Sequence, residues 1–223
     1  MELLRAEGIK RGYPSGGEIF WALKGLDFSI DEGQFAIFKG VSGSGKTTLM
    51  NILGALDPPT EGDVYFCSES IARAPDRKRD MIRRNEMGFV FQSLALVSMM
   101  TAYENVEFIL RICGYPAKDR RSRVQECLSM VGLASRMQHL ALELSGGEQQ
   151  RVAIARAIAH KPRIIFADEP TAELDTTTGL QVVKVLKDLI EQENVTIVMT
   201  THDPGLMDAA DIVYEMEDGE FLK

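Results

Sequence analysis

A glycine-rich segment at residues 40–47 constrains the fold more than any other feature of the chain. It reads Gly-Val-Ser-Gly-Ser-Gly-Lys-Thr and matches the pattern G-x-x-x-x-G-K-S/T in full. Residues 34–39 before it form a mainly apolar run that is typical of a buried strand, and residues 47–53 after it indicate a helix that must end before Pro58. A strand, a glycine loop and a helix in this order are the context that a phosphate-binding loop requires. A glycine-rich turn without a ligand is the alternative, which this context disfavours.

In such a loop, successive backbone N–H groups converge on the β- and γ-phosphates, and the following helix adds its positive dipole end. Lys46 supplies a mobile positive charge to the same oxygens, and the Thr47 hydroxyl is placed to ligate Mg²⁺. The sequence therefore predicts binding of ATP with Mg²⁺. The loop residues expected to contact the nucleotide are Gly40, Ser42, Gly43, Ser44, Gly45, Lys46, Thr47 and Thr48.

Further apolar runs predict an α/β fold with a largely parallel sheet. Residues 94–160 contain no strand-like run but several helical ones, broken near Gly114 and Gly132, and are predicted to form an inserted helical lobe. A helix is also predicted between Asp175 and Glu193, because its apolar residues recur with helical spacing. The predicted strands are residues 87–91, 164–167, 195–200 and 212–216.

Two adjacent carboxylates, Asp168 and Glu169, follow the predicted strand at residues 164–167. Side chains alternate along a strand, so the two should point differently and take different tasks. Asp168 suits the Mg²⁺ shell, and Glu169 is then free to act as general base on the attacking water. An acidic turn at a strand end is the alternative, which the phosphate loop disfavours.

A second candidate anion site precedes a helix that begins near residue 146. Ser145 and Glu148 have the spacing of a capping box. Gly146 and Gly147 cost helix stability, which suggests close approach by a ligand at this helix start.

Composition limits the remaining function classes. Lys and Arg number 25 against 33 Asp and Glu, a net charge of -8 that disfavours nucleic-acid binding through a broad basic face. The three cysteines form neither a disulfide framework nor a zinc pattern, so a reduced, cytoplasmic compartment is expected. No apolar run approaches the ~18 residues needed to span a bilayer, and the first residues do not read as a secretory signal. Any membrane role must therefore come through a partner.

Taken together, these motifs resemble the ABC ATPase family over essentially the whole chain. Residues 144–151 are similar to its signature motif, Gln92 to its Q-loop, residues 172–175 to its D-loop and His202 to its switch histidine. The resemblance implies a single domain over residues 1–223 with a P-loop NTPase (RecA-like) core and an N-terminal antiparallel β part. Residues 1–93 and 161–223 would form the catalytic lobe, and residues 94–160 the helical lobe.

The resemblance also implies roles for individual residues. Two chains would pair head to tail on binding ATP, so that Ser145, Gly146, Gly147 and Glu148 close over the partner's nucleotide. Gln92 would join Thr47 and Asp168 around Mg²⁺. The implied catalytic residues are Lys46, Gln92, Glu169 and His202. Tyr13 resembles the aromatic residue that stacks on adenine, with Phe20 and Trp21 as competitors.

Within the family, residues 49–57, 87–92 and 101–106 resemble the MacB-, LolD- and FtsE-type subgroup. This implies a Mg²⁺-dependent ATPase subunit of a bacterial ABC transporter, peripheral on the inner face of the cell membrane. An integral membrane permease would dock near residues 94–100, an apolar, methionine-rich segment suited to docking.

Two alternatives share these motifs: a soluble ABC ATPase of the cofactor-assembly type, and a DNA-repair ATPase. The second is disfavoured because the chain has neither heptads nor a cysteine cluster. Three positions depart from the subgroup, namely Val41, Ser98 and the extra carboxylate Glu173.

Overall fold

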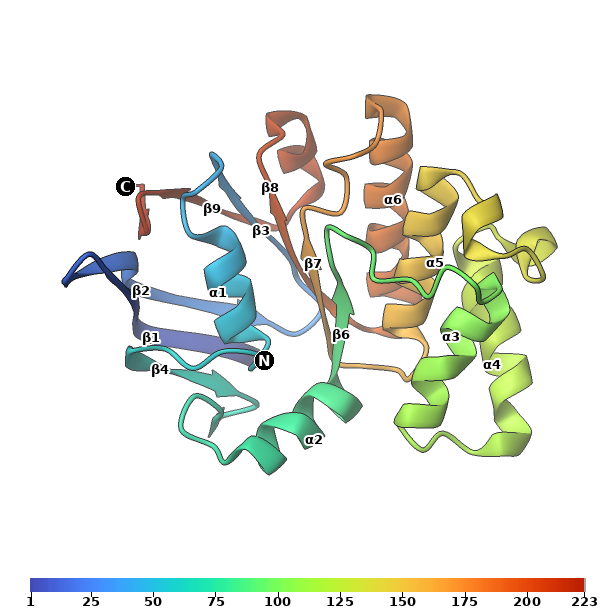
Figure 1. Cartoon of the computed structure of the whole chain (residues 1–223), viewed down its shortest axis with the longest axis horizontal. Helices are drawn as coiled ribbons and strands as arrows, with labels where there is room; N and C mark the ends of the chain where they lie inside the picture. The colour runs from blue at the N-terminus through green and yellow to red at the C-terminus, as the bar shows by residue number, and fades with distance from the viewer. Residues whose placement is uncertain (223) are drawn as a thin grey trace.

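The computed structural model describes residues 1–222, which form two β-sheets with helices packed around the larger one (Figure 1). The larger sheet has the strand order β10-β9-β3-β8-β7-β6, parallel except for the short β10. Every predicted strand is confirmed to within one residue at either end. The strands are β3 (Phe35–Gly40), β6 (Met87–Val90), β7 (Ile164–Asp168), β8 (Thr196–Thr201), β9 (Ile212–Glu217) and β10 (Glu220–Phe221).

A smaller antiparallel sheet, implied by the family resemblance, has the order β2-β1-β4-β5. Its two long strands form a hairpin that turns at Gly16 and Gly17, both with positive φ. This hairpin extends beyond the larger sheet on the side of α1 (Lys46–Leu53) (Figure 1). The strands are β1 (Glu2–Ser15), β2 (Glu18–Asp31), β4 (Glu61–Phe66) and β5 (Glu69–Ser70).

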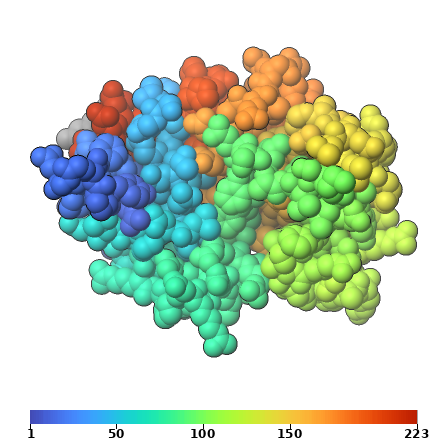
Figure 2. All heavy atoms as spheres, in the orientation of Figure 1, coloured from blue at the N-terminus to red at the C-terminus, as the bar shows by residue number. Residues whose placement is uncertain are grey.

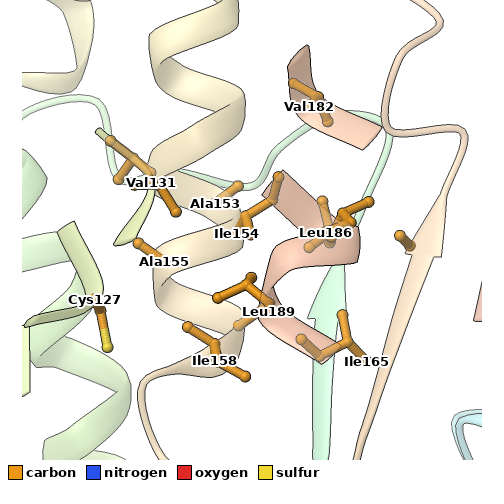
Figure 3. Close-up of a cluster of buried hydrophobic side chains, with 14 of the residues drawn as sticks. Cys127, Val131, Ala153, Ile154, Ala155, Ile158, Ile165, Val182, Leu186 and Leu189 are labelled. Atoms are coloured by element: carbon orange, nitrogen blue, oxygen red, sulfur yellow. The ribbon is translucent and has the colours of Figure 1, made fainter. Parts of the chain in front are cut away.

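Helices cover the other side of the parallel sheet and share a core with it. Apolar side chains of α4, α5 and α6 meet Ile165 of β7 in this core (Figure 3). Residues 94–160, which were predicted to form a helical lobe, thus have no core of their own. The boundaries of that lobe at residues 93 and 160 stay a prediction. The helices on this side are α3 (Ala102–Ile112), α4 (Ala117–Met130), α5 (Gly146–Ile158), α6 (Thr176–Glu193), and the short 3₁₀ helices η1 (Ala134–Arg136), η2 (Ala141–Glu143) and η3 (Pro204–Ala209). The remaining helix, α2 (Asp76–Glu86), shares the core of α1 through Ile82.

A buried arginine ties α4 to the C-terminal ends of α5 and α6. The Arg123 guanidinium donates to the carbonyls of Ile158 and Ala159 at 2.9 Å each and pairs with Glu193 at 2.8 Å. Burial opposes its positive charge, but the hydrogen bonds and charge interactions with Glu193, Glu126 and Cys127 together outweigh this and raise the pKa of Arg123. The helix that begins with the signature segment is therefore held at its far end by a charge-assisted network.

None of the helices within residues 1–222 is long and apolar enough to cross a lipid bilayer. Cys67, Cys113 and Cys127 are free thiols.

His160, which follows α5, has a packing role that makes stability depend on pH. Its Nε2 atom lies 3.0 Å from the Met87 carbonyl oxygen, and burial lowers its pKa below the usual 6.5. The unfolded chain therefore binds more protons than the folded chain as the pH falls through 6.5 toward the lower folded value, so acid destabilises the fold. We expect the free energy of unfolding to fall more in the wild type than in His160→Gln between about pH 7.5 and about pH 5. Urea unfolding across this range measures it, and parallel pH profiles would show the interpretation to be wrong.

Candidate nucleotide-binding site

The carboxyl ends of β3, β7 and β8 meet at one edge of the sheet, where parallel α/β folds place their ligands. A cavity of about 810 Å³ opens there, large enough for a nucleotide. It brings together six segments of the chain. The lining residues are Tyr13, Phe20, Ala22, Val41, Ser42, Gly43, Gly45, Lys46, Thr47, Thr48, Gln92, Glu169, Ala172 and His202.

The phosphate loop leaves the N-terminus of α1 without a capping side chain. Its N-cap is Gly45, in the left-handed conformation with φ 102°, and no side chain accepts a hydrogen bond there. In contrast, Thr101, Ser145 and Asp175 cap α3, α5 and α6 with their side chains. The first N–H groups of α1 are thus free of a capping side chain, as a helix that holds a phosphate requires.

Two residues predicted to contact the nucleotide, Gly40 and Ser44, do not line the cavity. A Cβ on Gly40 would lie 2.4 Å from the Met216 carbonyl oxygen and 2.5 Å from Ser44 Oγ, so the loop packs tightly against β9 at this point. Ser44 is 2% exposed, and its hydroxyl has no hydrogen-bond partner among the described residues. Both residues belong to the loop but lie on its buried side, where they shape its backbone.

The Lys46 ammonium lies buried within the loop. It donates to the carbonyls of Gly40 at 2.8 Å and Val41 at 3.0 Å, and it lies 3.3 Å from Glu169 Oε1. These three oxygens hold the positively charged ammonium group of Lys46 at the wall of the cavity. A triphosphate oxygen would be a stronger partner than a carbonyl because its hydrogen bond to Lys46 joins two charges.

Glu169 is held in place by its backbone as well as its side chain. Its φ of 46° lies in the left-handed region, which a residue other than glycine adopts at a cost typical of functional sites. Its N–H donates to Thr200 Oγ1 at 2.8 Å, and its second carboxylate oxygen lies 3.0 Å from His202 Nδ1. The carboxylate therefore lies between Lys46 and His202, as the predicted general base and switch histidine require.

Asp168 and Glu169 line different cavities, but the cause is not strand alternation, because β7 ends at Asp168 and Glu169 has a left-handed backbone. Its Oδ1 accepts a hydrogen bond of 2.6 Å from Thr200 Oγ1. Together with Gln92 it lines a smaller cavity of about 310 Å³, and Gln92 also lines the larger one. Gln92 thus lies between the cavity that Glu169 lines and the cavity that Asp168 lines.

Thr200 is a site residue that the sequence analysis missed. It pairs with Asp168 across the parallel strands β7 and β8, is fully buried, and bridges Asp168 and the Glu169 N–H. The available signal was a threonine that directly follows the apolar residues 197–199 and lies two residues before His202.

The donor set near Asp168 fits Mg²⁺ bound together with a nucleotide. The described residues contain no group of three or more His, Cys, Asp or Glu side chains suited to a metal. Thr47, Gln92 and Asp168 offer a hydroxyl, an amide and a carboxylate. Mg²⁺ commonly uses one or two carboxylates and completes its shell with phosphate oxygens and waters.

Two aromatic rings lie on the β1–β2 hairpin at the open end of the cavity. Tyr13 and Phe20 are direct cross-strand partners, and both line the cavity, whereas Trp21 does not. The Arg11 guanidinium lies 4.8 Å from the centre of the Tyr13 ring and forms an ion pair with Asp57. Arg11 thus supports Tyr13, and both Tyr13 and Phe20 remain candidates for stacking on adenine.

The signature residues do not line this cavity. Ser145 and Glu148 form the predicted capping box: the Glu148 carboxylate accepts from the Ser145 N–H at 2.9 Å, and these bonds lower the pKa of Glu148. Gly146 is exposed, whereas a Cβ on Gly147 would lie 2.5 Å from the Thr178 methyl group of α6. A glycine is therefore required at position 147 because Thr178 of the same chain packs against it. Only Gly146 leaves room for a ligand.

Glu173, the extra carboxylate of the D-loop segment, lines the smaller cavity with Gln92 and Asp168. Two residues later, the Asp175 side chain caps α6 through Thr178, and this hydrogen bonding lowers the pKa of Asp175.

Known proteins resemble this chain over nearly its whole length. Residues 23–172 match the model of the ABC transporter family. Over 221 residues the chain is 42% identical to MJ1508 of Methanocaldococcus jannaschii, an uncharacterized ABC transporter ATP-binding protein, covering 99% of this chain and 98% of that one. It is 42% identical over 218 residues to the macrolide export ATP-binding/permease protein MacB of Wolinella succinogenes, covering 98% of this chain and 34% of MacB.

Solved structures agree with these matches. The ATP-binding cassette MJ0796 of M. jannaschii, solved as a dimer in a post-hydrolysis state with ADP and Pi, superposes with a TM-score of 0.90 at 41% identity, covering 99% of this chain and 97% of that one. CbiO1 of Clostridium perfringens, part of an ABC transporter complex, superposes with a TM-score of 0.89 at 29% identity, covering 100% and 87%.

Proposed function

The chain belongs to the ABC transporter family, and from this membership we propose that it is the ATP-binding and ATP-hydrolysing subunit of a bacterial ABC transporter with a membrane partner of the MacB or lipoprotein-release type. One observation carries the proposal. The Glu169 carboxylate lies within hydrogen-bonding reach of both Lys46 and His202, beside the uncapped start of α1.

In the proposed reaction, the loop N–H groups and Lys46 bind the β- and γ-phosphates. Lys46 exchanges its contact with Glu169 for a phosphate oxygen, which frees that carboxylate to accept a proton from water. The water oxygen forms a bond to the γ-phosphorus, and the bond from that phosphorus to the ADP oxygen breaks. His202 holds the Glu169 carboxylate in orientation. Mg²⁺ would neutralise charge on the phosphate oxygens, and Thr47, Gln92 and Asp168 are placed to hold it.

The reaction site is proposed to be complete only in a dimer. The residues Ser145, Gly146, Gly147 and Glu148 lie outside the cavity of their own chain. The dimeric form of the cassette MJ0796 supports pairing in which these residues meet the partner's nucleotide. Binding of ATP would then bring two chains together, and hydrolysis would separate them.

A membrane permease is proposed to dock beside the Q-loop and to hold the chain at the inner face of the membrane. MacB, which carries ATP-binding and permease functions in its name, matches this chain over 34% of its length and supports such a partnership. In residues 94–100, Leu94 and Leu96 pack against the core, whereas Val97 and Met99 are 42% and 76% exposed. The docking role is therefore proposed for Val97 and Met99.

Phosphate release from ATP tests the proposed function. We expect release with Mg²⁺ and none with EDTA, at a rate per chain that rises with protein concentration because two chains complete each site. A malachite-green assay over a concentration series measures this. A rate per chain that is independent of concentration would argue against completion by a second chain, and absence of release would argue against the enzyme.

Met99→Glu is expected to weaken membrane association, because it places a charge on the exposed apolar surface. The fraction of tagged chain that sediments with membranes of the native host measures the effect. Val213→Glu is the matched control, since Val213 is 40% exposed and lies in β9, far from β6 in the sheet order. Equal loss in both variants, or none in either, would remove residues 94–100 from the docking surface.

A further inference from the structure

The start of α5, which is proposed to meet the partner's nucleotide, lies at the surface of the chain. Ser145 and Gly146 are both exposed. Figure 2 shows the yellow residues around this helix start at the surface, beside the orange residues that begin α6. A phosphate that approaches from a second chain therefore meets the Ser145 hydroxyl together with the first N–H groups of α5.

Both polar groups of Ser145 are already bonded to Glu148. The Ser145 N–H and hydroxyl donate to the same carboxylate oxygen, Oε2, at 2.9 Å and 3.0 Å, and the Glu148 N–H donates to Ser145 Oγ at 3.3 Å. Hydrogen bonding from Ser145, aided by the charge of Arg136, lowers the pKa of Glu148, so this carboxylate is ionised at neutral pH. A phosphate that accepts the Ser145 hydroxyl must therefore compete with a carboxylate, and two like charges then face each other.

Arg136 supplies a positive charge beside this carboxylate. Its Nε lies 3.2 Å from Glu148 Oε1, which is the oxygen that Ser145 does not use. Within residues 1–222, no other cationic side chain forms an ion pair with Glu148. An exposed pair of this kind contributes little to stability. Its effect should therefore be felt mainly by an anion that approaches the start of α5.

The Arg136 guanidinium is held on a second side by His139. Its Nη1 donates to His139 Nε2 at 3.2 Å, since a guanidinium can only donate. The backbone of His139 is fixed in turn, because its N–H donates to the Arg136 carbonyl at 3.0 Å and its carbonyl accepts from the Ala102 N–H at 2.9 Å. The start of α3 thus holds the segment that carries Arg136 against the start of α5.

We propose that Arg136 is a positioning residue of the site that a second chain completes: it neutralises Glu148, so that the partner's phosphate can accept the Ser145 hydroxyl. In this exchange the hydroxyl turns from Glu148 Oε2 to a phosphate oxygen, while the carboxylate keeps its bonds to the Ser145 N–H and to Arg136. Without Arg136, the unpaired carboxylate would repel the phosphate. This inference rests on the proposed pairing of two chains.

Dimer formation by the Glu169→Gln chain with ATP and Mg²⁺ tests the role of Arg136. Adding Arg136→Gln should weaken dimer formation by about 100-fold, which is about tenfold at each of two equivalent sites. The ATP affinity of the single chain should not change, because Arg136 does not line the nucleotide cavity. Sedimentation velocity over a concentration series measures the dimer, and ATP titration of the dilute chain shows that the variant is folded.

Arg111→Gln in the same background is the matched control. Arg111 lies in the last turn of α3 and pairs with Glu107 at 3.0 Å, so this change also removes an exposed arginine from an ion pair with a glutamate. Its dimer formation should equal that of the Glu169→Gln chain. Unchanged dimer formation in the Arg136→Gln variant, or an equal loss in both variants, would overturn the proposal.

Adding Glu148→Gln to the Arg136→Gln variant separates charge neutralisation from a structural role. Glutamine can keep the capping box with Ser145 but carries no charge. Dimer formation should therefore recover by about tenfold or more relative to Arg136→Gln. No recovery would show that Arg136 does not act through the charge of Glu148, and would overturn the proposal.

The Glu169→Gln chain by itself distinguishes this inference from the proposed function. If that chain stays monomeric with ATP, the proposed pairing of two chains is wrong, and the role of Arg136 falls with it. If it dimerises and the Arg136→Gln variant dimerises equally well, only the role of Arg136 is wrong.

Discussion

Glu169→Gln is expected to slow ATP turnover by about 10²- to 10⁴-fold while nucleotide affinity is kept. The amide has nearly the same shape as the carboxylate but cannot accept the proton from water. Its contacts to Lys46 and His202 can be replaced by amide contacts, and its backbone bond to Thr200 is untouched. Rapid-quench measurement of phosphate formation gives the rate.

The same variant should accumulate as an ATP-bound dimer, because the step that separates the two chains is removed. Sedimentation velocity with and without ATP measures the dimer fraction. The matched control is Ser145→Arg in the Glu169→Gln background, which blocks the exposed helix start at the proposed contact with the partner's phosphate. This double variant should bind ATP and stay monomeric. If Glu169→Gln turns over at the wild-type rate, Glu169 is not the base. If this variant stays monomeric with ATP, the proposed completion of the site by a second chain is wrong.

Lys46→Ala is expected to weaken ATP binding by about 10- to 100-fold, since hydrogen bonds to charged groups are worth roughly 1.5–3 kcal/mol. The side chain is 4% exposed and lines the cavity as its one lysine, so no surface lysine can replace it. Isothermal titration with ATP measures the affinity.

The control for this prediction is Lys39→Ala. Lys39 lies one residue before the loop and pairs with Glu215 at 2.7 Å, outside the cavity lining. Its loss should leave ATP affinity near the wild-type value. Wild-type affinity in Lys46→Ala would remove this loop as the phosphate site, and equal weakening in both variants would indicate a general effect on the loop backbone.

The parts of the site that are contiguous in the chain were predictable. The phosphate loop, the Asp168–Glu169 pair and the capping box at Ser145 each depend on neighbouring residues, and the structure confirms the helix after the loop, the strand before the pair and the capping box. The parallel strands were predictable because fully buried strands are continuously apolar.

Contacts between distant segments were not predictable in the same way. The bond from Thr200 to Asp168 depends on the register of β7 against β8, and the pairing of Tyr13 with Phe20 depends on the hairpin register. Gly147 was read as room for a ligand, but only the packing of α5 against α6 shows that Thr178 occupies that space.

The sequence by itself determined the chemistry of this protein: which groups can bind phosphate, hold a divalent cation and take a proton, since these follow from residue type and short spacing. Only the tertiary structure decided which groups act together. It placed Glu169 between Lys46 and His202, left the signature residues outside their own chain's cavity, and paired Arg136 with Glu148. The physical reason is that sheet register and helix packing are set by the burial of the whole core, which no short stretch of sequence contains.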